Sequence, residues 1–256
     1  KYGVKTIPLE MHGSVTKLIK SPVFKNNPNI LQDFVGEPAV QIILNHPASN
    51  YCIQDTPQKA FHKTDQHIIE TICKPYGIDN PKIKCDIFLE EQEESDIDNL
   101  LLGVPDKFVT IEPFSKTNYT PNRAYPIEKW QKIVNEIHEK ITVVQVGNTG
   151  HVLENVIDFT GKTTFRQAAG IIGRSSLFLA TESGLVHAAS AFNTKSIVII
   201  TGYQTEKMVA YPMNININIS SHGPCGLKVS CPECIEDAAV HDEAEITRAA
   251  LEYLCL

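Results

Sequence analysis

From residue 108 onward, short apolar runs alternate with longer segments in which apolar residues recur every three or four positions. The short runs cover residues 108–111, 141–146, 156–159, 177–180, 196–201 and 215–219. Runs of this length predict buried strands, and the spaced segments predict helices with one apolar face. Strands that alternate with helices of about ten residues indicate a parallel sheet covered on both faces. We therefore expect a doubly wound α/β domain here.

Three of the expected helices carry apolar residues at positions i, i+3, i+4 and i+7. These sets are Trp130, Ile133, Val134 and Ile137; Phe165, Ala168, Ala169 and Ile172; and Leu185, Ala188, Ala189 and Phe192. Each set would turn one face towards the core. Pro126 suits the first turn of the first helix, and a last helix is expected from about Asp242.

The first hundred residues give weaker α/β signals. Strands are expected near 4–7, 40–44 and 83–89, and a helix from about Asp65 should end at Gly77.

The acidic segment 90–98 is interpreted as a solvated loop or helix face, because no histidine or turn glycine accompanies its carboxylates as in a metal site. Residues 103–106, Gly-Val-Pro-Asp, are typical of a crossing between domains. We predict one domain over residues 1–103 and a second over 104–256.

The charge balance narrows the class of partner. The chain has 23 basic and 30 acidic residues, a net charge of −7, which argues against nucleic acid and against a direct grip on an anionic membrane. No apolar run approaches the roughly 18 residues of a membrane span, and no signal peptide is recognised at the start. We expect a cytoplasmic protein. Because the chain opens with Lys1, we also expect the natural protein to continue upstream.

Polar residues gather in three loops that follow strands of the predicted sheet. The loops contribute Ser115, Lys116 and Arg123; Gly147 and Asn148; and Glu182, Ser183, Gly184 and Leu185, with His187 one turn into the next helix. The carboxyl ends of parallel strands meet at one edge of a sheet, so these loops should converge on one crevice. The first amides of a helix, together with its dipole, favour an anion such as phosphate.

The candidates in this crevice have alternative roles. Arg123 could bond two oxygens of a diphosphate, or it could be a surface loop residue. Glu182 could accept hydrogen bonds from ribose hydroxyls, or it could cap the helix that follows. A lone histidine such as His187 is more often structural than catalytic. The segment 161–164, Gly-Lys-Thr-Thr, lacks the first glycine of a P-loop, so Thr163 or Thr164 is expected to cap a helix.

Three of the seven cysteines lie close together. Cys225, Cys231 and Cys234 fall in a segment with Pro224, Gly226 and Pro232, and His222 and His241 are candidate fourth ligands. A CxxC pair in a reducing compartment commonly binds metal, here a structural Zn or Fe. The alternative is a cysteine-bearing loop packed beside the crevice.

The segment 179–189 resembles the acidic-Ser/Thr-Gly-x-x-His-x-Ala turn of glycosyltransferase family 9, the ADP-heptose:lipopolysaccharide heptosyltransferases and their relatives. The segment 161–164 is similar to the family's Gly-Lys-Thr-Ser/Thr step. The segment 123–126, with Trp130, resembles its Lys-x-Trp-Pro segment. The resemblance covers residues 108–254, and it implies a GT-B fold of two Rossmann-like doubly wound domains, the N-terminal one lacking its first strand and helix.

Carried over by residue, the resemblance implies that Arg123 meets the diphosphate and Glu182 the nucleoside, with Ser183, Gly184 and His187 on the phosphate and donor side. The family more often has Asp and Lys in place of Glu182 and Arg123, so the donor nucleotide need not be ADP. The family's general base is not recognised here; Glu10 and His12 stand near its place by position only.

The resulting hypothesis is an inverting glycosyltransferase in lipopolysaccharide-type biosynthesis. It would move a heptose or hexose from a nucleotide diphosphate to a glycan, lipid-linked or protein hydroxyl, without a metal for the transfer itself. An acceptor carried on a lipid would bring it to a membrane surface only peripherally. A non-catalytic sugar-nucleotide-binding protein and a GT-B-like sugar-nucleotide epimerase are the alternatives.

Overall fold

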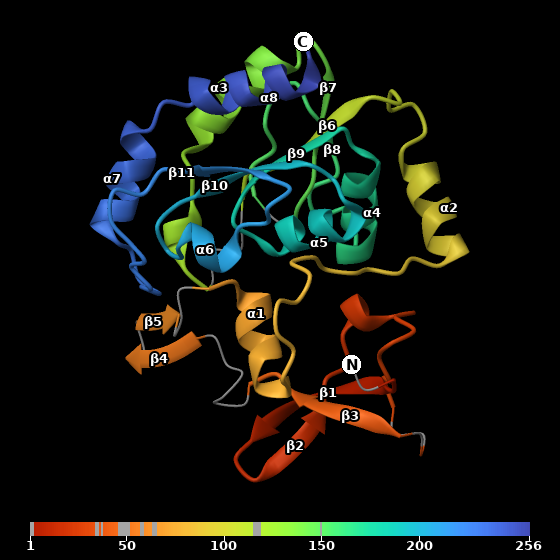
Figure 1. Ribbon diagram of the computed structural model, residues 1–256. Coiled ribbons are helices and arrows are strands. Elements are labelled where there is room, and N and C mark those ends of the chain that lie inside the picture. The colour runs from red at the N-terminus through yellow and green to blue at the C-terminus, as the bar shows by residue number, and fades with distance from the viewer. Residues whose placement is uncertain are drawn as a thin grey trace.

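The computed structural model describes residues 3–33, 36, 38–45, 52–56, 59–62, 66–114, 119–148 and 150–256. Figure 1 shows two lobes, with small sheets in the N-terminal lobe and one large sheet between layers of helices in the C-terminal lobe. No helix of the described residues is both long enough and apolar enough for a membrane span.

The large sheet has six strands, all parallel. They are β6 (Phe108–Glu112), β7 (Thr142–Gln145), β8 (Ile157–Asp158), β9 (Leu177–Thr181), β10 (Ser196–Ile200) and β11 (Ile215–Asn218). Their order is β11-β10-β9-β6-β7-β8, so the first strand of the domain lies beside the fourth. This is the strand order of doubly wound dinucleotide-binding domains, and it places the topological switch point between β6 and β9. The predicted parallel sheet is confirmed.

Helices cover both faces of the sheet. On one face lie α3 (Ile127–Ile137) and α8 (Ala244–Leu254), and on the other lie α4 (Phe165–Arg174) and α5 (Gly184–Phe192), as Figure 1 shows. Two short helices, α6 (Glu206–Val209) and α7 (Pro232–Val240), precede and follow β11. Each face has its own apolar core, centred on Trp130 and Ile133 on one side and on Ile172 and Ala189 on the other.

The start of α4 differs from the sequence prediction in one residue. Thr164 caps the helix, with its side chain accepting from the backbone of Gln167, as expected. Ala168, Ala169 and Ile172 are buried, but Phe165 is 36% exposed and lines a cavity. The prediction of Phe165 as a core residue is wrong, because this first helical residue borders a cavity instead of the packed core that contains Ile172.

The N-terminal lobe has a three-stranded sheet in the order β2-β1-β3. Its strands are β1 (Lys5–His12), β2 (Val15–Leu18) and β3 (Ala39–Ile43); β1 pairs parallel with β3 and antiparallel with β2. Its small core is Ile7, Leu9 and Leu31. The lobe also holds η1 (Pro22–Phe24), the pair β4 (Cys52–Thr56) and β5 (Lys59–His62), α1 (Ile68–Cys73) and η2 (Lys74–Tyr76). Gly77, with φ of 60°, ends this helical stretch as predicted.

Residues 83–89 connect the lobes and correct a second prediction. They are extended but form no strand. Ile83, Cys85, Ile87 and Leu89 pack against the core under α4 and α5. Apolar residues at every second position fit a strand, but a segment that lies on the core without pairing with another strand shows the same pattern.

The acidic segment forms α2 (Glu91–Leu100), which packs on α4. Ile97 is fully buried, and a side chain at Gly170 of α4 would come within 2.2 Å of it. The interpretation of this segment as merely solvated is therefore incomplete, because Glu94 and Asp98 pair with Arg174.

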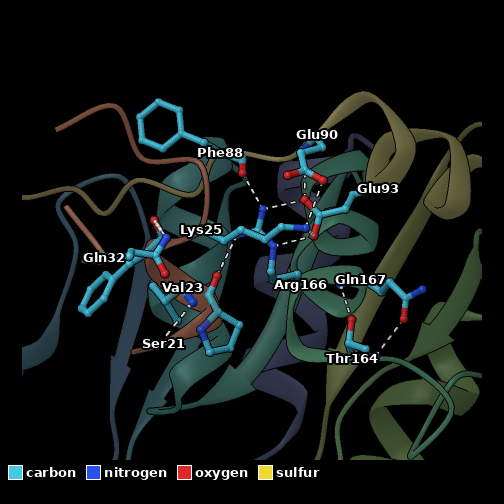
Figure 2. A network of polar contacts seen from close by, with 12 residues as sticks. Ser21, Val23, Lys25, Gln32, Phe88, Glu90, Glu93, Thr164, Arg166 and Gln167 are labelled. Atoms are coloured by element: carbon cyan, nitrogen blue, oxygen red, sulfur yellow. Dashed lines mark hydrogen bonds and ion pairs between the residues drawn. The ribbon is translucent and has the colours of Figure 1, made fainter. Parts of the chain in front are cut away.

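Figure 2 shows the contact of this helix with Arg166 of α4, whose side chain is buried. Its guanidinium binds both carboxylate oxygens of Glu93 at 2.7 Å and donates to the backbone carbonyls of Pro22, at 2.9 Å, and Phe88. The hydrogen bond from Arg166 lowers the pKa of Glu93 to about 2. One buried cation thus joins η1, the connecting segment and α2 to the C-terminal lobe.

Candidate functional site

Two cavities lie on either side of the turn formed by Ser183 and Gly184. We call the first the arginine cavity; it has a volume of about 350 Å³ and includes Arg123, Glu182, His187 and Gln204, with Ile68 of α1 as a wall from the N-terminal lobe. We call the second the Phe165 cavity; it has a volume of about 390 Å³ and includes Glu112, Gly147, Asn148, Phe165 and Leu185. Both contain Ser183 and Gly184.

The shared turn is the junction of β9 and α5. Ser183 is the N-cap residue, and its hydroxyl accepts from the backbone N–H of Leu185 at 3.2 Å. The turn follows β9 at the switch point, and α5 points its amino end at both cavities. Backbone N–H groups and the helix dipole there favour an anion.

Arg123 is the last residue of η3 (Pro121–Arg123) and is half-buried. Its Nη2 donates to Gln204 at 3.1 Å, and its guanidinium carbon lies 4.8 Å from the ring centroid of Tyr203 and 5.7 Å from that of Tyr119. Its Nε is buried and has no hydrogen-bond partner among the described residues. The side chain is fixed in place with donor capacity to spare.

Glu182 is 4% exposed and accepts hydrogen bonds from the backbone N–H and the hydroxyl of Thr201, at 3.2 and 3.1 Å. Burial raises its pKa, and the charge of Arg123 opposes that shift. Of the two roles open from the sequence, capping belongs to Ser183 instead. Glu182 ties the turn to the end of β10 and supplies a carboxyl group near the guanidinium.

His187 has a defined hydrogen bond on one ring nitrogen. Its Nδ1 lies 2.6 Å from the hydroxyl of Tyr211, which lies 3.2 Å from the Sγ of Cys85. Burial lowers the pKa of His187 to about 4, so the ring is neutral at pH 7. With Nδ1 engaged, Nε2 is the nitrogen left for a ligand in the arginine cavity.

Glu112, the last residue of β6, is a site residue that the sequence reasoning did not single out. The Ser183 hydroxyl donates to its carboxylate across the switch point. It is 8% exposed, and burial raises its pKa to about 8. A side chain at Gly147, where φ is 129°, would lie 3.6 Å from the Cγ of Glu112. The available signal was a carboxylate directly after the apolar run 108–111, at the end of the strand that begins the domain.

The predicted crevice residues divide between the cavities. Arg123, Glu182 and His187 line the arginine cavity; Gly147, Asn148 and Leu185 line the Phe165 cavity; Ser183 and Gly184 line both. Ser115 and Lys116 lie outside the described residues. The roles of all these residues in binding remain predictions.

The cysteine segment forms a compact cluster close to the loop that carries Arg123. The Nε2 of His222 lies 3.6 Å from the Sγ of Cys231 and 3.5 Å from the Sγ of Cys234. The Sγ of Cys225 lies 3.5 Å from that of Cys234. His241, the other candidate ligand, faces the hydroxyl of Tyr125 and Glu245 instead.

This cluster fits a structural metal by its donor set. Three thiols and an imidazole are typical ligands of zinc and of iron. The other ring nitrogen of His222 lies 3.0 Å from Asp237, the carboxylate–histidine arrangement that orients metal ligands. The hydrogen bond with Cys234 lowers the pKa of Cys225 to about 6, which favours its thiolate, whereas burial raises the pKa of Cys231 and the contact with Cys225 raises that of Cys234.

The doubly wound sheet, with a helix terminus and an adjacent arginine at its switch point, defines a Rossmann-like domain. A family model narrows this class: that of glycosyltransferase family 9 (heptosyltransferase) matches residues 58–237, more than half of the chain, and the chain belongs to this family. The resemblance found in the sequence is confirmed.

Solved structures support the fold. The chain is 14% identical to the glycosyl transferase family 9 protein of Veillonella parvula, with a TM-score of 0.60 over 78% of this chain and 62% of that one. It is 15% identical to E. coli ADP-heptose lps heptosyltransferase II, with a TM-score of 0.53 over 70% of this chain and 56% of that one. It is 14% identical to the iron-containing dodecameric glycosyltransferase TibC of enterotoxigenic E. coli, with a TM-score of 0.64 over 93% of this chain and 69% of that one.

These structures confirm the expected GT-B type of α/β fold. The chain spans less than two thirds of the length of the first two, 62% and 56%. The comparison with curated proteins gave no match.

Proposed function

We propose that this protein is an inverting glycosyltransferase that transfers a sugar from a nucleotide diphosphate donor to an acceptor hydroxyl. The observation that carries the proposal is that Arg123 and the Ser183–Gly184 turn border one cavity, while a second cavity opens on the other side of the same turn. A diphosphate lying on the turn would place its sugar in one cavity and its nucleoside in the other.

The linings suggest which part goes where. The arginine cavity holds the guanidinium and His187, and its wall includes Ile68 of the N-terminal lobe, so it suits the distal phosphate and the sugar facing an acceptor. The Phe165 cavity has an aromatic side chain and the polar groups of Glu112 and Asn148, which suit a base and a ribose. Glu182, expected at the nucleoside, would then act by holding Thr201 and balancing Arg123.

The chemistry follows from these positions. The acceptor oxygen attacks the anomeric carbon as the bond to the diphosphate breaks, and negative charge grows on the leaving phosphate. Arg123 and the first amides of α5 would stabilise that charge, and the neutral ring of His187 would donate from Nε2. A carboxylate across the cleft would take the acceptor proton.

That base remains unidentified. Glu10 and His12 pair with each other at 2.9 Å and are exposed on β1. The β1–β2 hairpin lies at the bottom of Figure 1, away from the C-terminal lobe. Neither residue lines the two cavities.

The family and one neighbour support the class of donor. The family description is heptosyltransferase, and TibC has also been solved in complex with ADP-D-β-D-heptose, with a TM-score of 0.61 to this chain. We therefore propose a nucleotide-linked heptose or hexose as donor and a glycan, lipid-linked or protein hydroxyl as acceptor. TibC is described as iron-containing, and we propose that His222, Cys231 and Cys234, whose ligand atoms lie within 4.8 Å of one another, hold Zn or Fe here as a structural cross-link. Cys225, in contact with Cys234, would be the fourth ligand.

A thermal-shift screen with ADP-, GDP-, UDP- and dTDP-linked sugars tests the donor assignment. A ligand that binds only the native state raises the melting temperature, so one nucleotide series should stand out. Transfer of a radiolabelled sugar from that donor then separates an enzyme from a non-catalytic binding protein. An epimerase would change the donor sugar without any acceptor. The absence of a shift with all four series would refute the proposal.

A further inference from the structure

Asn122 lies next to the arginine in η3 and is 3% exposed. Its side chain is directed into the loop 225–231. The Oδ1 atom accepts from the backbone N–H of Cys231 at 2.9 Å, and Nδ2 donates to the carbonyls of Leu227 and Val229, each at 2.9 Å. The same Nδ2 lies 3.7 Å from the Sγ of Cys225. One buried amide thus satisfies backbone groups at three points of the cysteine loop.

Thr120 strengthens this attachment and is 1% exposed. Its hydroxyl donates to the carbonyl of Leu227 at 2.7 Å and accepts from the backbone N–H of Asn122 at 3.2 Å. The turn that carries the arginine is therefore fastened to the cysteine loop by two adjacent buried side chains.

The same loop also fastens the residues that hold the guanidinium. The backbone N–H of Cys225 donates to the carbonyl of Gly202 at 2.9 Å, and that of Gly226 donates to Tyr203 at 3.4 Å. The ring of Tyr203 lies against the guanidinium of Arg123, and the side chain of Gln204 accepts a hydrogen bond from that guanidinium. The cysteine loop therefore connects the backbone that carries Arg123 to the backbone that orients its side chain.

We infer that Asn122 is a positioning residue: it sets the place of Arg123 over the Ser183–Gly184 turn by anchoring η3 to the Cys/His cluster. Hydrogen bonds to a buried amide are directional, and removal of one partner leaves the others unsatisfied, so the anchor resists small displacements. The inference rests on the proposed function, because it assumes that Arg123 binds the donor diphosphate. It assigns the cysteine cluster a role in donor binding without contact to the donor.

The test uses titration calorimetry to compare the nucleoside diphosphate that the thermal-shift screen selects with its nucleoside; ADP and adenosine stand for that pair. In Asn122→Ala the guanidinium loses its fixed position, so we expect the Kd of ADP to rise about 10-fold, the size typical for a lost interaction with a charged group. Adenosine has no phosphate for Arg123 to bind, and its Kd should stay within about 2-fold. A purely structural role would weaken both ligands equally.

A second variant and a matched control keep the test sharp. Thr120→Val keeps the side-chain volume and removes both hydroxyl bonds; the Kd of ADP should rise about 3-fold. If circular dichroism shows that Asn122→Ala does not fold, the Thr120→Val variant is used for the test instead. Asn214→Ala removes a buried amide just before β11, at the end of this strand opposite the cysteine loop, where its Oδ1 accepts from the start of β10, and should leave the ratio of the two Kd values unchanged.

The outcomes separate the inference from the proposed function. If Arg123→Ala weakens ADP while every folded variant of Asn122 and Thr120 binds ADP as the unchanged protein does, the positioning role is refuted and the site assignment stands. If Arg123→Ala also binds ADP normally, both are refuted. Selective loss of ADP affinity in the Asn122 and Thr120 variants supports the inference.

Discussion

The two cavities share the Ser183–Gly184 turn but differ in what surrounds it. On one side a guanidinium, a buried carboxyl and a neutral imidazole face the space, and a wall comes from the N-terminal lobe. On the other side the lining combines a phenylalanine, an alanine, a leucine and glycines with polar side chains: an asparagine, two threonines, the shared serine and one carboxyl whose pKa burial raises to about 8. All of it belongs to the C-terminal lobe.

This difference shows how a single turn could bind a ligand whose two ends differ in chemistry. The helix terminus between the cavities suits the anion in the middle, and the two linings suit a charged end and an aromatic end. Substitutions on the arginine side should thus affect the phosphate-bearing ligand alone, whereas those on the Phe165 side should affect ligands with or without phosphate. The predictions below test this separation.

Arg123→Ala should have the largest effect. The loss of a charge-assisted contact to phosphate should raise the Kd of ADP about 100-fold, while adenosine binding is retained. Titration calorimetry with ADP and with adenosine measures the two Kd values. Arg174→Ala, which removes a guanidinium that pairs with α2 far from the turn, is the control and should bind ADP normally. Equal losses for ADP and adenosine in Arg123→Ala would contradict the separation.

Glu112→Gln should change the pH dependence of stability. The folded-state pKa of Glu112 is about 8, above its usual 4.5, so its stabilising contribution is complete below pH 4.5 and is lost as the pH rises towards 8. Glutamine mimics the protonated carboxyl and does not titrate. The melting temperature of the variant relative to the unchanged protein should therefore rise by about 5 °C or more between pH 5.5 and 8.5.

Melting curves at four pH values are sufficient for this measurement. Glu154→Gln, which changes an exposed carboxylate, provides the control. A difference that stays constant with pH would show that Glu112 is ionised in the folded protein throughout this range.

Tyr211→Phe should have a moderate effect confined to the arginine side. Without the hydroxyl on Nδ1, the ring of His187 is free to change tautomer and orientation, so the Kd of ADP should rise about 5-fold. Titration of the His187 resonances by NMR gives an independent measure of the changed environment. Tyr253→Phe, at an exposed position of α8, should change neither. An unaltered His187 spectrum in Tyr211→Phe would contradict the assigned contact.

Phe165→Ala should have the smallest effect and the opposite selectivity. Phe165 is partly exposed on the Phe165 cavity, so its removal should cost little stability. We expect the Kd values of ADP and adenosine to rise together, about 3-fold, through loss of contact with the base. A loss for ADP alone would place the nucleoside outside this cavity.

Much of the C-terminal lobe was predictable because its strands are short apolar runs and its helices keep a regular apolar spacing. The sequence pattern also located the Ser183–Gly184 turn and the arginine. It missed Glu112: the carboxylate after the run 108–111 was visible, but its contact with Ser183 depends on the pairing of β6 with β9, which no local pattern contains. It misread residues 83–89 because period two shows that one face is buried but not what covers it. Asn122 lacked any signal, as its partners lie more than a hundred residues away.

The candidate metal ligands also could not be fully assigned from the sequence pattern. The spacing of the cysteines was visible, but the choice between His222 and His241 required the geometry. His222 is held by Asp237 from α7, and the whole cluster depends on how that helix returns beside β11.

The buried guanidinium of Arg166 bears on how such a two-lobed chain can move. It fixes residues of η1 and of the connecting segment to α4, and a rotation of the lobes that keeps these hydrogen bonds would turn about Arg166 while α1, whose Ile68 and Ile69 pack against the core under α4 and α5, slides on that core. Because α4 also supplies the first turn that borders the Phe165 cavity, that cavity would keep its shape through the rotation. The arginine cavity, with Ile68 of α1 in its wall, would widen or narrow instead as α1 slides, so an acceptor could be exchanged while the nucleotide stays bound.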